Sequence, residues 1–270
     1  MIRRRNRKND EMQISERELS SMTRELDTLH QETFPAVRTM LDGLSTNLVQ
    51  VTRAPAARRN FLLGVGGAVA LGAAAACSKN SGSGGGGAAT STTGPSATAA
   101  GSPYTGDLRV VALAAALENL AVTAYQGALT MAGQGKLGAV PPAVATFVRT
   151  AMKQHADHSQ AWNAVLSKAG KPTITGAPLT ITDQQVAMLN AARSVPDVAK
   201  LALSLENAAA QTYTFAAANV SDPGGIMTAA TIQPVETMHA AILYFVLGEY
   251  PVPASFIGVD NAVKPDVLTR

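Results

Sequence analysis

The sequence predicts an all-α fold, a four-helix bundle with a long crossover from the second helix to the third (the B-to-C link). Between residues 107 and 247, apolar residues recur at helical spacing in four long stretches, and no stretch of useful length alternates as a strand would. The links between the first and second helices and between the third and fourth are short, whereas the middle link is long. This succession of helices and links matches a known bundle topology.

Glycine and proline residues mark where the predicted helices begin and end. Pro142 opens the second helix and Gly170 closes it, because proline is tolerated in a first turn and glycine favours a helix end. Asp-Pro-Gly-Gly at 222–225 separates the third helix from the fourth, and Pro234 is expected to kink the fourth or shift its start. The four long helices and one short helix in the crossover are predicted over residues 107–131, 142–168, 182–192, 196–219 and 226–247.

The region also contains an internal repeat. Leu-Glu-Asn at 117–119 recurs at 205–207, so that Glu118 coincides with Glu206 when one copy is placed on the other. The same alignment matches apolar residues on both sides of this motif and matches Tyr125 with Tyr213. We interpret the region as two copies of one helix pair.

Six acidic and imidazole side chains fall in the middle of the four long predicted helices: Glu118, His155, His158, Glu206, Glu236 and His239. Two of the helices carry a pair of them three residues apart, and side chains at this spacing lie on one face of a helix. Their neighbours are mostly Ala, Leu, Val and Met, so we expect all six to point into the core. Burying an unpaired carboxylate is costly, and a coordinated cation offsets that cost. Oxygen and imidazole ligands without thiolate suit iron, manganese or zinc.

Each of these residues also has a plainer interpretation. Glu118 and Glu206 could be surface charges that recur only because the helix pair was duplicated. His155 could be a core histidine that is hydrogen-bonded to a nearby polar group. Tyr125 and Tyr213, two turns after the glutamates, could donate hydrogen bonds to metal ligands or could simply fill the core.

Residues 107–248 resemble a ferritin-like domain, similar to those of exported, stand-alone ferritin-like proteins. The resemblance implies a single glutamate on each of two helices and Glu-x-x-His on each of the other two, which together hold two metal ions. Glu118 and Glu206 match the single-glutamate positions. Glu236 with His239 matches one Glu-x-x-His motif.

The other motif departs from the family pattern. His158 matches its histidine, but His155 stands where the family has a glutamate that tends to bridge the two ions. A neutral imidazole brings no negative charge and does not bridge as a carboxylate does. The resemblance therefore implies an altered two-metal site, a single bound ion, or a site without redox chemistry.

The chain as a whole divides into five parts: an N-terminal extension (1–57), a signal-like segment (58–77), a Gly/Ser-rich tether (78–104), the bundle (105–248) and a proline-containing tail (249–270). The extension is predicted to be cytosolic and to form one or two amphipathic helices broken near Pro35, with no assigned function. Alternatively, translation starts at Met22 or Met40.

The signal-like segment begins with Arg58 and Arg59, continues without charge from 61 to 76 and ends at Cys77. A basic start, a short apolar region and small residues before the end are typical of an export signal. The segment resembles a twin-arginine signal, which exports proteins already folded, and Cys77 resembles the lipidated residue of a lipoprotein. An uncleaved, loosely anchored helix is the alternative. We expect export and anchoring at the outer face of the cytoplasmic membrane.

Charge and cysteine content exclude several classes of protein. Of the 22 Lys and Arg and the 19 Asp and Glu, residues 78–270 hold eleven of each, so this part is formally neutral. Nucleic acid is therefore not expected as its main partner, since phosphate binding needs a positive surface. The single cysteine excludes an internal disulfide and a cysteine-based zinc or iron–sulfur site.

Two functions fit these observations. The first is an exported metal-binding protein that uses iron or manganese, as two ions or one, in redox or peroxide chemistry, with zinc as a possible occupant. The second is a cell-envelope structural or binding protein whose ferritin-like site is degenerate and inactive. The sequence leaves open whether the protein is an enzyme. Metal storage in a closed cage is not favoured, because a tethered subunit is awkward to assemble into a shell.

Overall fold

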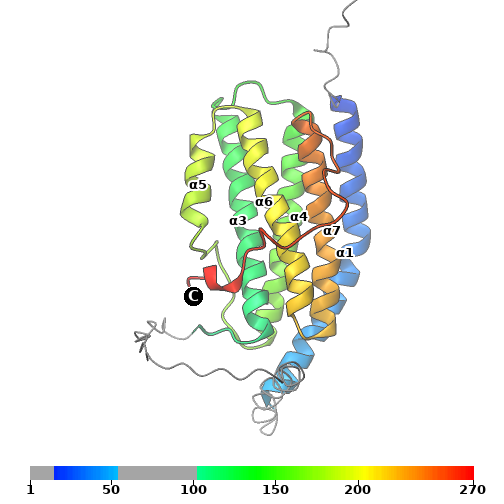
Figure 1. Ribbon diagram of the computed structural model, residues 1–270, viewed down its shortest axis with the longest axis vertical. Helices are drawn as coiled ribbons and strands as arrows, with labels where there is room; N and C mark the ends of the chain where they lie inside the picture. The colour runs from blue at the N-terminus through cyan, green and yellow to red at the C-terminus, as the bar shows by residue number, and fades with distance from the viewer. Residues whose placement is uncertain (1–14, 54–101) are drawn as a thin grey trace, which may run out of the picture. The chain divides into compact units, whose positions relative to one another are not determined.

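The computed structural model describes residues 15–53 and 102–270, and within these ranges every helix or strand assigned is a helix (Figure 1). In chain order the helices are α1 (Glu16–Arg53), α3 (Asp107–Gly133), α4 (Pro142–Lys168), α5 (Thr182–Ala191), α6 (Val195–Asn219), α7 (Pro223–Val246) and a short 3-10 helix, η1 (Pro265–Val267). The all-α prediction is confirmed for the described residues. The signal-like segment at 58–77 and nearly all of the tether lie outside them.

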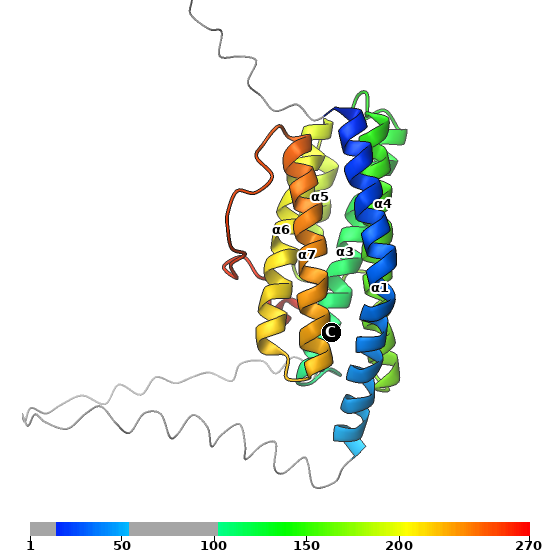
Figure 2. The same cartoon turned by 90° about the vertical axis from the view of Figure 1, so that its right-hand side faces the viewer.

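Four long helices, α3, α4, α6 and α7, lie side by side and are called the helix pack below (Figures 1 and 2). α3 packs along α4 and α6 packs along α7, and further contacts join α3 to α6 and α4 to α7. α5, in the link between α4 and α6, lies against α3 and α6. The two helix pairs correspond to the two copies of the sequence repeat.

α3 is long and apolar enough to cross a membrane by length and composition alone. Its apolar residues are largely used inside the protein, where Leu108, Val111, Leu113 and Leu120 are buried. The same helix carries a buried glutamate, Glu118, into the interior. These are the properties of a core helix.

α1 belongs to the same compact unit as the helix pack, because that unit comprises residues through Thr46 and from Pro103 onward. The prediction that this region breaks near Pro35 is wrong, since α1 runs through Pro35 as one helix. An internal proline removes one backbone hydrogen bond. Here apolar side chains on both sides of it, including Leu26 and Leu41, are buried and hold the two halves in line.

The predicted bounds of the other helices differ from the observed ones by three residues at most. The largest difference is at α7, which begins at Pro223 rather than at 226. The Asp222 carboxylate caps this end by accepting hydrogen bonds from the backbone N–H groups of Gly224 and Gly225. Pro223 fits the first turn because its missing N–H would have no partner there. The Asp-Pro-Gly-Gly sequence thus ends the link that follows α6 and forms the first turn of α7.

The link between α4 and α6 is held by side chains of the helix pack. The Asn119 amide donates to the carbonyl oxygens of Ile174 and Gly176, at 3.2 and 2.8 Å. Asn163 accepts from the backbone N–H of Ile174 at 2.7 Å. The C-terminal tail pairs with the same link, where the N–H of Thr180 donates to the carbonyl of Val267 at 2.9 Å. These bonds leave the link fixed over α3 and α6.

Packing of α1 against the start of α7 leads to a test. A Cβ atom added at Gly224 would lie 2.8 Å from the backbone oxygen of Met40 in α1, so Gly224→Ala should push the two helices apart. We expect Gly224→Ala to lower the free energy of unfolding by about 1–3 kcal/mol in urea titrations. Gly43→Ala is the matched control, because nothing lies within 4 Å of the added atom there. An unchanged stability in Gly224→Ala would contradict this packing.

Candidate metal centre

The six predicted site residues all lie in the interior, and none is more than 3% exposed. α3 supplies Glu118, α6 supplies Glu206, α4 supplies two histidines and α7 supplies a glutamate and a histidine. Within α4 and α7, the spacing of three residues places the two side chains on one face. The structure therefore brings together every residue that the sequence nominated.

The side chains form two overlapping groups whose ligand atoms lie within 4.8 Å of one another. One group consists of Glu118, His155, His158 and Glu236, and the other of His155, Glu206, Glu236 and His239. His155 and Glu236 belong to both groups. Each of the two adjacent groups could therefore hold a cation, and the groups share two residues.

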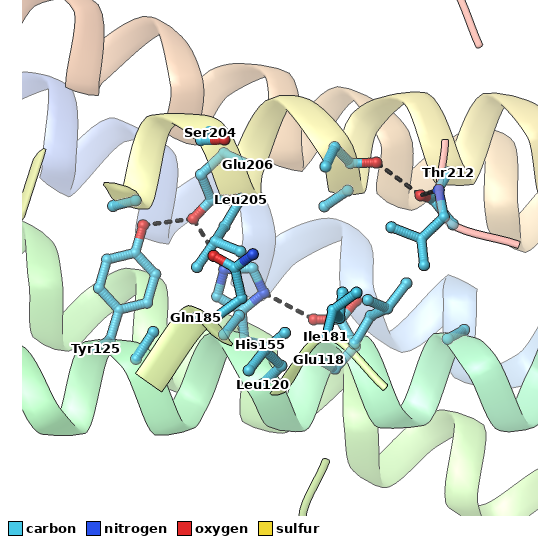
Figure 3. A pocket seen from close by; sticks show the side chains of 18 of the residues that line it. Glu118, Leu120, Tyr125, His155, Ile181, Gln185, Ser204, Leu205, Glu206 and Thr212 are labelled. Atoms are coloured by element: carbon cyan, nitrogen blue, oxygen red, sulfur yellow. Dashed lines mark hydrogen bonds and ion pairs between the residues drawn. The ribbon is translucent and has the colours of Figure 1, made fainter. Parts of the chain in front are cut away.

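His155 lies between the two single glutamates (Figure 3). Its Nδ1 is 2.7 Å from Oε2 of Glu118, and its Nε2 is 3.1 Å from Oε1 of Glu206. Burial by itself would lower the pKa of His155, but Glu206 and Glu236 raise it well above its ordinary value. Without metal, a doubly protonated ring donates to both glutamates.

Each single glutamate also accepts a hydrogen bond from a tyrosine of the opposite helix pair. The Tyr125 hydroxyl of α3 donates to Glu206 of α6, and the Tyr213 hydroxyl of α6 donates to Glu118 of α3. Burial, followed by the neighbouring glutamate, raises the pKa of both tyrosines well above the ordinary value, so both remain donors. The exchange is reciprocal, as a two-fold relation between the two helix pairs requires.

Three polar atoms in the cluster have no hydrogen-bond partner among the described residues: Nδ1 of His158 and both carboxylate oxygens of Glu236. Nδ1 of His158 lies 3.4 Å from Oε1 of Glu236 and 3.4 Å from Oε1 of Glu118. Leaving a buried polar group unsatisfied costs about 1–3 kcal/mol, and more for a charged one. A cation between these atoms would satisfy them, so the residues fit a metal ion.

The charges of the cluster balance one another in the absence of metal. Burial by itself would raise the pKa of Glu118, but His158 and His155 beside it lower that pKa to about 2. Burial would lower the pKa of His158, whereas Glu118 and Glu236 raise it to about 9. A metal ion must therefore compete with protons for the imidazoles.

Two residues that the sequence analysis did not predict as part of the site contact the Nε2 atoms of His239 and His158, which face away from the carboxylates. Nε2 of His239 lies 2.8 Å from Oε1 of Gln154, and Nε2 of His158 lies 3.1 Å from Nε2 of His30 in α1. Both contacts leave Nδ1 as the nitrogen that faces the carboxylates. No local pattern marks either residue: Gln154 is an isolated amide, and His30 is a lone histidine in an amphipathic helix.

An apolar cavity of about 170 Å³ leads to the cluster between α3, α5 and α6 (Figure 3). Alanine, leucine and valine side chains form most of its wall, and the polar groups that line it include Glu118, His155 and Glu206. A small uncharged molecule could therefore reach the carboxylates from this side.

Comparison with protein families matches residues 106–249 to the ferritin-like domain. The chain belongs to the ferritin-like family. The match agrees with the resemblance at 107–248, and the buried Glu and His residues lie within it. Comparisons with the curated proteins and with the solved structures find no match. The ferritin-like domain of this chain thus has an all-helical fold and a buried cluster able to bind metal.

The stability of the metal-free protein should depend on pH through this cluster. The pKa of His158 is raised from 6.5 to about 9, so its protonated ring stabilises the fold below pH 6.5 and loses that effect as pH rises through 9. The pKa of Glu118 is lowered from 4.5 to about 2, so its contribution is present above pH 4.5 and lost as pH falls through 2.

We therefore expect the free energy of unfolding to be greatest between about pH 4.5 and 6.5 and to fall by up to about 3 kcal/mol on the basic side. Urea titrations of chelator-treated protein across this range measure the effect. His158→Gln should make the basic limb shallower, and the part that remains comes from His155 and His239, whose pKa values are also raised by the neighbouring glutamates. An equally steep limb in that variant would show that another group causes it.

Proposed function

We propose that this chain is an exported, membrane-anchored ferritin-like protein whose buried centre binds iron or manganese for redox or peroxide chemistry. Its helix pack is the four-helix bundle of that family, with the α4-to-α6 link as the long crossover. The observation that carries the proposal is the set of three buried polar atoms, on His158 and Glu236, that converge inside the cluster without a hydrogen bond and have only ion-pair contacts of 3.4 Å or more.

The donor set supports iron or manganese. Three carboxylates and three imidazoles, without thiolate, suit these ions, and zinc satisfies the same ligands. His155 and Glu236 belong to both ligand groups, and Glu236 is the carboxylate of the two, so its two oxygens would be available to both groups. Bound iron or manganese would supply electrons to dioxygen or peroxide.

Other residues of the chain would orient the ligands and restrict access to them. Tyr125 and Tyr213 hold Glu206 and Glu118 by hydrogen bonds, which limits the directions in which these carboxylates bind. The apolar cavity between α3 and α6 favours small uncharged molecules over ions. Dioxygen and hydrogen peroxide meet this requirement.

Export and anchoring are supported by the sequence of residues 58–77. The arginine pair, the short uncharged stretch and Cys77 are arranged as in a twin-arginine lipoprotein signal. A lipid on Cys77, followed by the Gly/Ser-rich tether, would hold the ferritin-like domain near the outer face of the cytoplasmic membrane.

A second function is favoured by His155. This ring, in the place of a family glutamate, is hydrogen-bonded to Glu118 and Glu206, which also accept from tyrosines. Those two carboxylates are therefore satisfied without a cation. A structural or binding protein of the cell envelope with an inactive site would keep this network and would have no need of metal.

Substitution of Glu236 separates the two functions. We expect the wild-type chain to retain one or two iron or manganese ions through gel filtration, and Glu236→Gln to lower metal affinity at least about 10-fold, because both ligand groups lose a charged oxygen. Metal analysis measures the content. Glu249→Gln, at an exposed position just beyond α7, is the matched control.

The same proteins test redox chemistry. After anaerobic loading with ferrous ion, admission of air should produce the near-ultraviolet absorbance of ferric ion in wild type and the Glu249 variant, and little in Glu236→Gln. A wild-type chain that binds metal without oxidising ferrous ion would favour the inactive site. A wild-type chain that binds no metal would exclude the redox function.

Mass spectrometry of the native N-terminus tests export and anchoring. We expect the mature chain from the membrane fraction to begin at Cys77 and to carry the added mass of lipid. Cys77→Ser should abolish lipidation. A wild-type chain that retains its first 57 residues would contradict processing at this site.

A further inference from the structure

All four histidines of the chain meet at one place, although one of them lies far from the others in the sequence. His155, His158 and His239 come from the helix pack, and His30 comes from the middle of α1. Nε2 of His30 lies 3.1 Å from Nε2 of His158, and His30 is 3% exposed. Figure 2 shows α1 running alongside α4, the helix that carries His158.

The face of α1 that carries His30 is packed as a core surface. Its buried apolar residues are Leu19, Leu26, Phe34, Val37, Leu41 and Leu44. Phe34 stacks on the His30 ring, with centroids 4.8 Å apart, and its ring also lies 5.3 Å from that of His158. Gly224 approaches the backbone of α1 so closely that a Cβ atom would not fit. α1 is therefore packed against the helix pack both at His30 and farther along the helix, near Met40.

The ring nitrogens of His158 face in two directions. Nδ1 faces the carboxylates of Glu118 and Glu236, and Nε2 faces His30. A histidine that binds a cation through Nδ1 carries its proton on Nε2, and that N–H needs an acceptor. Nε2 of His30 is at the right distance to accept it, with the proton of His30 on Nδ1. The 3.1 Å contact accommodates either direction of donation, and a cation at Nδ1 of His158 selects this one.

His30 makes no other hydrogen bond among the described residues. Its Nδ1 is buried without a partner, so placing this ring in the interior costs free energy. A Leu or Phe would fill the same space without that cost. Within the described part of the chain, the contact with His158 is the one hydrogen bond of the ring, and it accounts for a histidine at this position.

The other half of the centre contains the same arrangement, built from a different helix. His239 of α7 faces Glu206 and Glu236 through Nδ1, and its Nε2 lies 2.8 Å from Oε1 of Gln154 in α4. Gln154 directly precedes His155. His155 and His158 of α4 can be matched to Glu236 and His239 of α7. In this match the counterpart of Gln154 is Val235, which directly precedes Glu236.

Val235 cannot accept a hydrogen bond through its side chain. The position in α7 that should serve His158, as Gln154 serves His239, is therefore apolar. α1 supplies the missing acceptor. We propose that α1 is a fifth helix of the metal centre and that His30 is a positioning residue, which accepts a hydrogen bond from Nε2 of His158 and holds Nδ1 toward the ion.

This role rests on the proposed metal binding, and substitutions in the full-length chain test it. His30→Leu removes the acceptor and leaves an apolar side chain to fill the space, whereas His30→Gln supplies an amide oxygen, the kind of acceptor that Gln154 offers to His239. Thr23→Val is the matched control: Thr23 is buried on α1, and its hydroxyl donates a hydrogen bond to the carbonyl of Leu19 within the same helix. Circular dichroism and melting temperature verify that each variant folds.

Cobalt(II) and zinc(II) are the probes. We expect His30→Leu to lower the affinity for one cobalt ion by about 10–100-fold and to change the visible ligand-field spectrum. His30→Gln should restore both to near wild type, and Thr23→Val should leave both unchanged. Equal affinity and spectrum in wild type and His30→Leu would overturn the positioning role alone. A wild-type chain that binds neither metal would overturn the proposed function as well.

Nuclear magnetic resonance of zinc-loaded wild type with 15N-labelled histidine gives a readout independent of affinity. We expect His158 to carry its proton on Nε2 and neutral His30 to carry its proton on Nδ1. A proton on Nε2 of His30, donated to an unprotonated His158 nitrogen, would overturn the proposal. Loss of the His158 N–H signal through solvent exchange in His30→Leu, and its return in His30→Gln, would support it.

Discussion

The whole arrangement depends on carboxylates that are held away from water. Glu118, Glu206 and Glu236 are at most 3% exposed, and each comes from a different helix. An isolated buried carboxylate is strongly unfavourable, so each needs an opposite charge or a hydrogen-bond donor within reach. Imidazoles from α4 and α7 meet this need only when the helices lie in one relative position. Sliding one helix by a turn, about 5.4 Å, would leave a charge buried and unpaired. The cluster thus specifies how the helices align, in addition to any chemistry it supports.

The sequence repeat explains why the two ligand groups of the cluster resemble each other. The positions where the repeat fails explain how the two groups differ. The reciprocal bonds of Tyr125 and Tyr213 to the glutamates of the opposite helix pair preserve the two-fold relation. The relation fails at two positions when α4 is matched to α7. His155 in α4 corresponds to Glu236 in α7, and Gln154 corresponds to Val235. The first exception replaces one negative charge with a ring that can become positive. The second removes an acceptor from α7, at the place where α1 brings one.

Much of the ferritin-like domain could be predicted because the relevant signals are local. Helical periodicity gave the helices, and spacing within each helix together with the repeat gave the six cluster residues. The start of α7 lies three residues before the predicted one because Asp-Pro-Gly-Gly both follows the end of α6 and caps the next helix. The continuity of α1 through Pro35 depends on burial against the helix pack, which its own sequence does not indicate. Likewise, His30 and Gln154 acquire their partners only through tertiary packing.

The order of the segments constrains when α1 can contribute to the proposed metal centre. The proposed export signal at 58–77 lies between α1 and the ferritin-like domain. A signal inserted across a membrane would hold its two flanks on opposite sides, and cleavage before Cys77 would separate α1 from the domain altogether. The contact between His30 and His158 then belongs to the precursor, while both parts share one compartment.

A protein exported in the folded state can take up metal before transport, when α1 is in place and His158 is held from both sides. After processing, Nε2 of His158 would lose its acceptor, whereas His239 would keep Gln154. The two halves of the centre would then differ in how firmly their histidines are oriented. Exposure of the surface that α1 had covered would also open the His158 side of the cluster. Removal of the N-terminal segment would thus change the properties of the metal centre without altering any of its six nominated ligands.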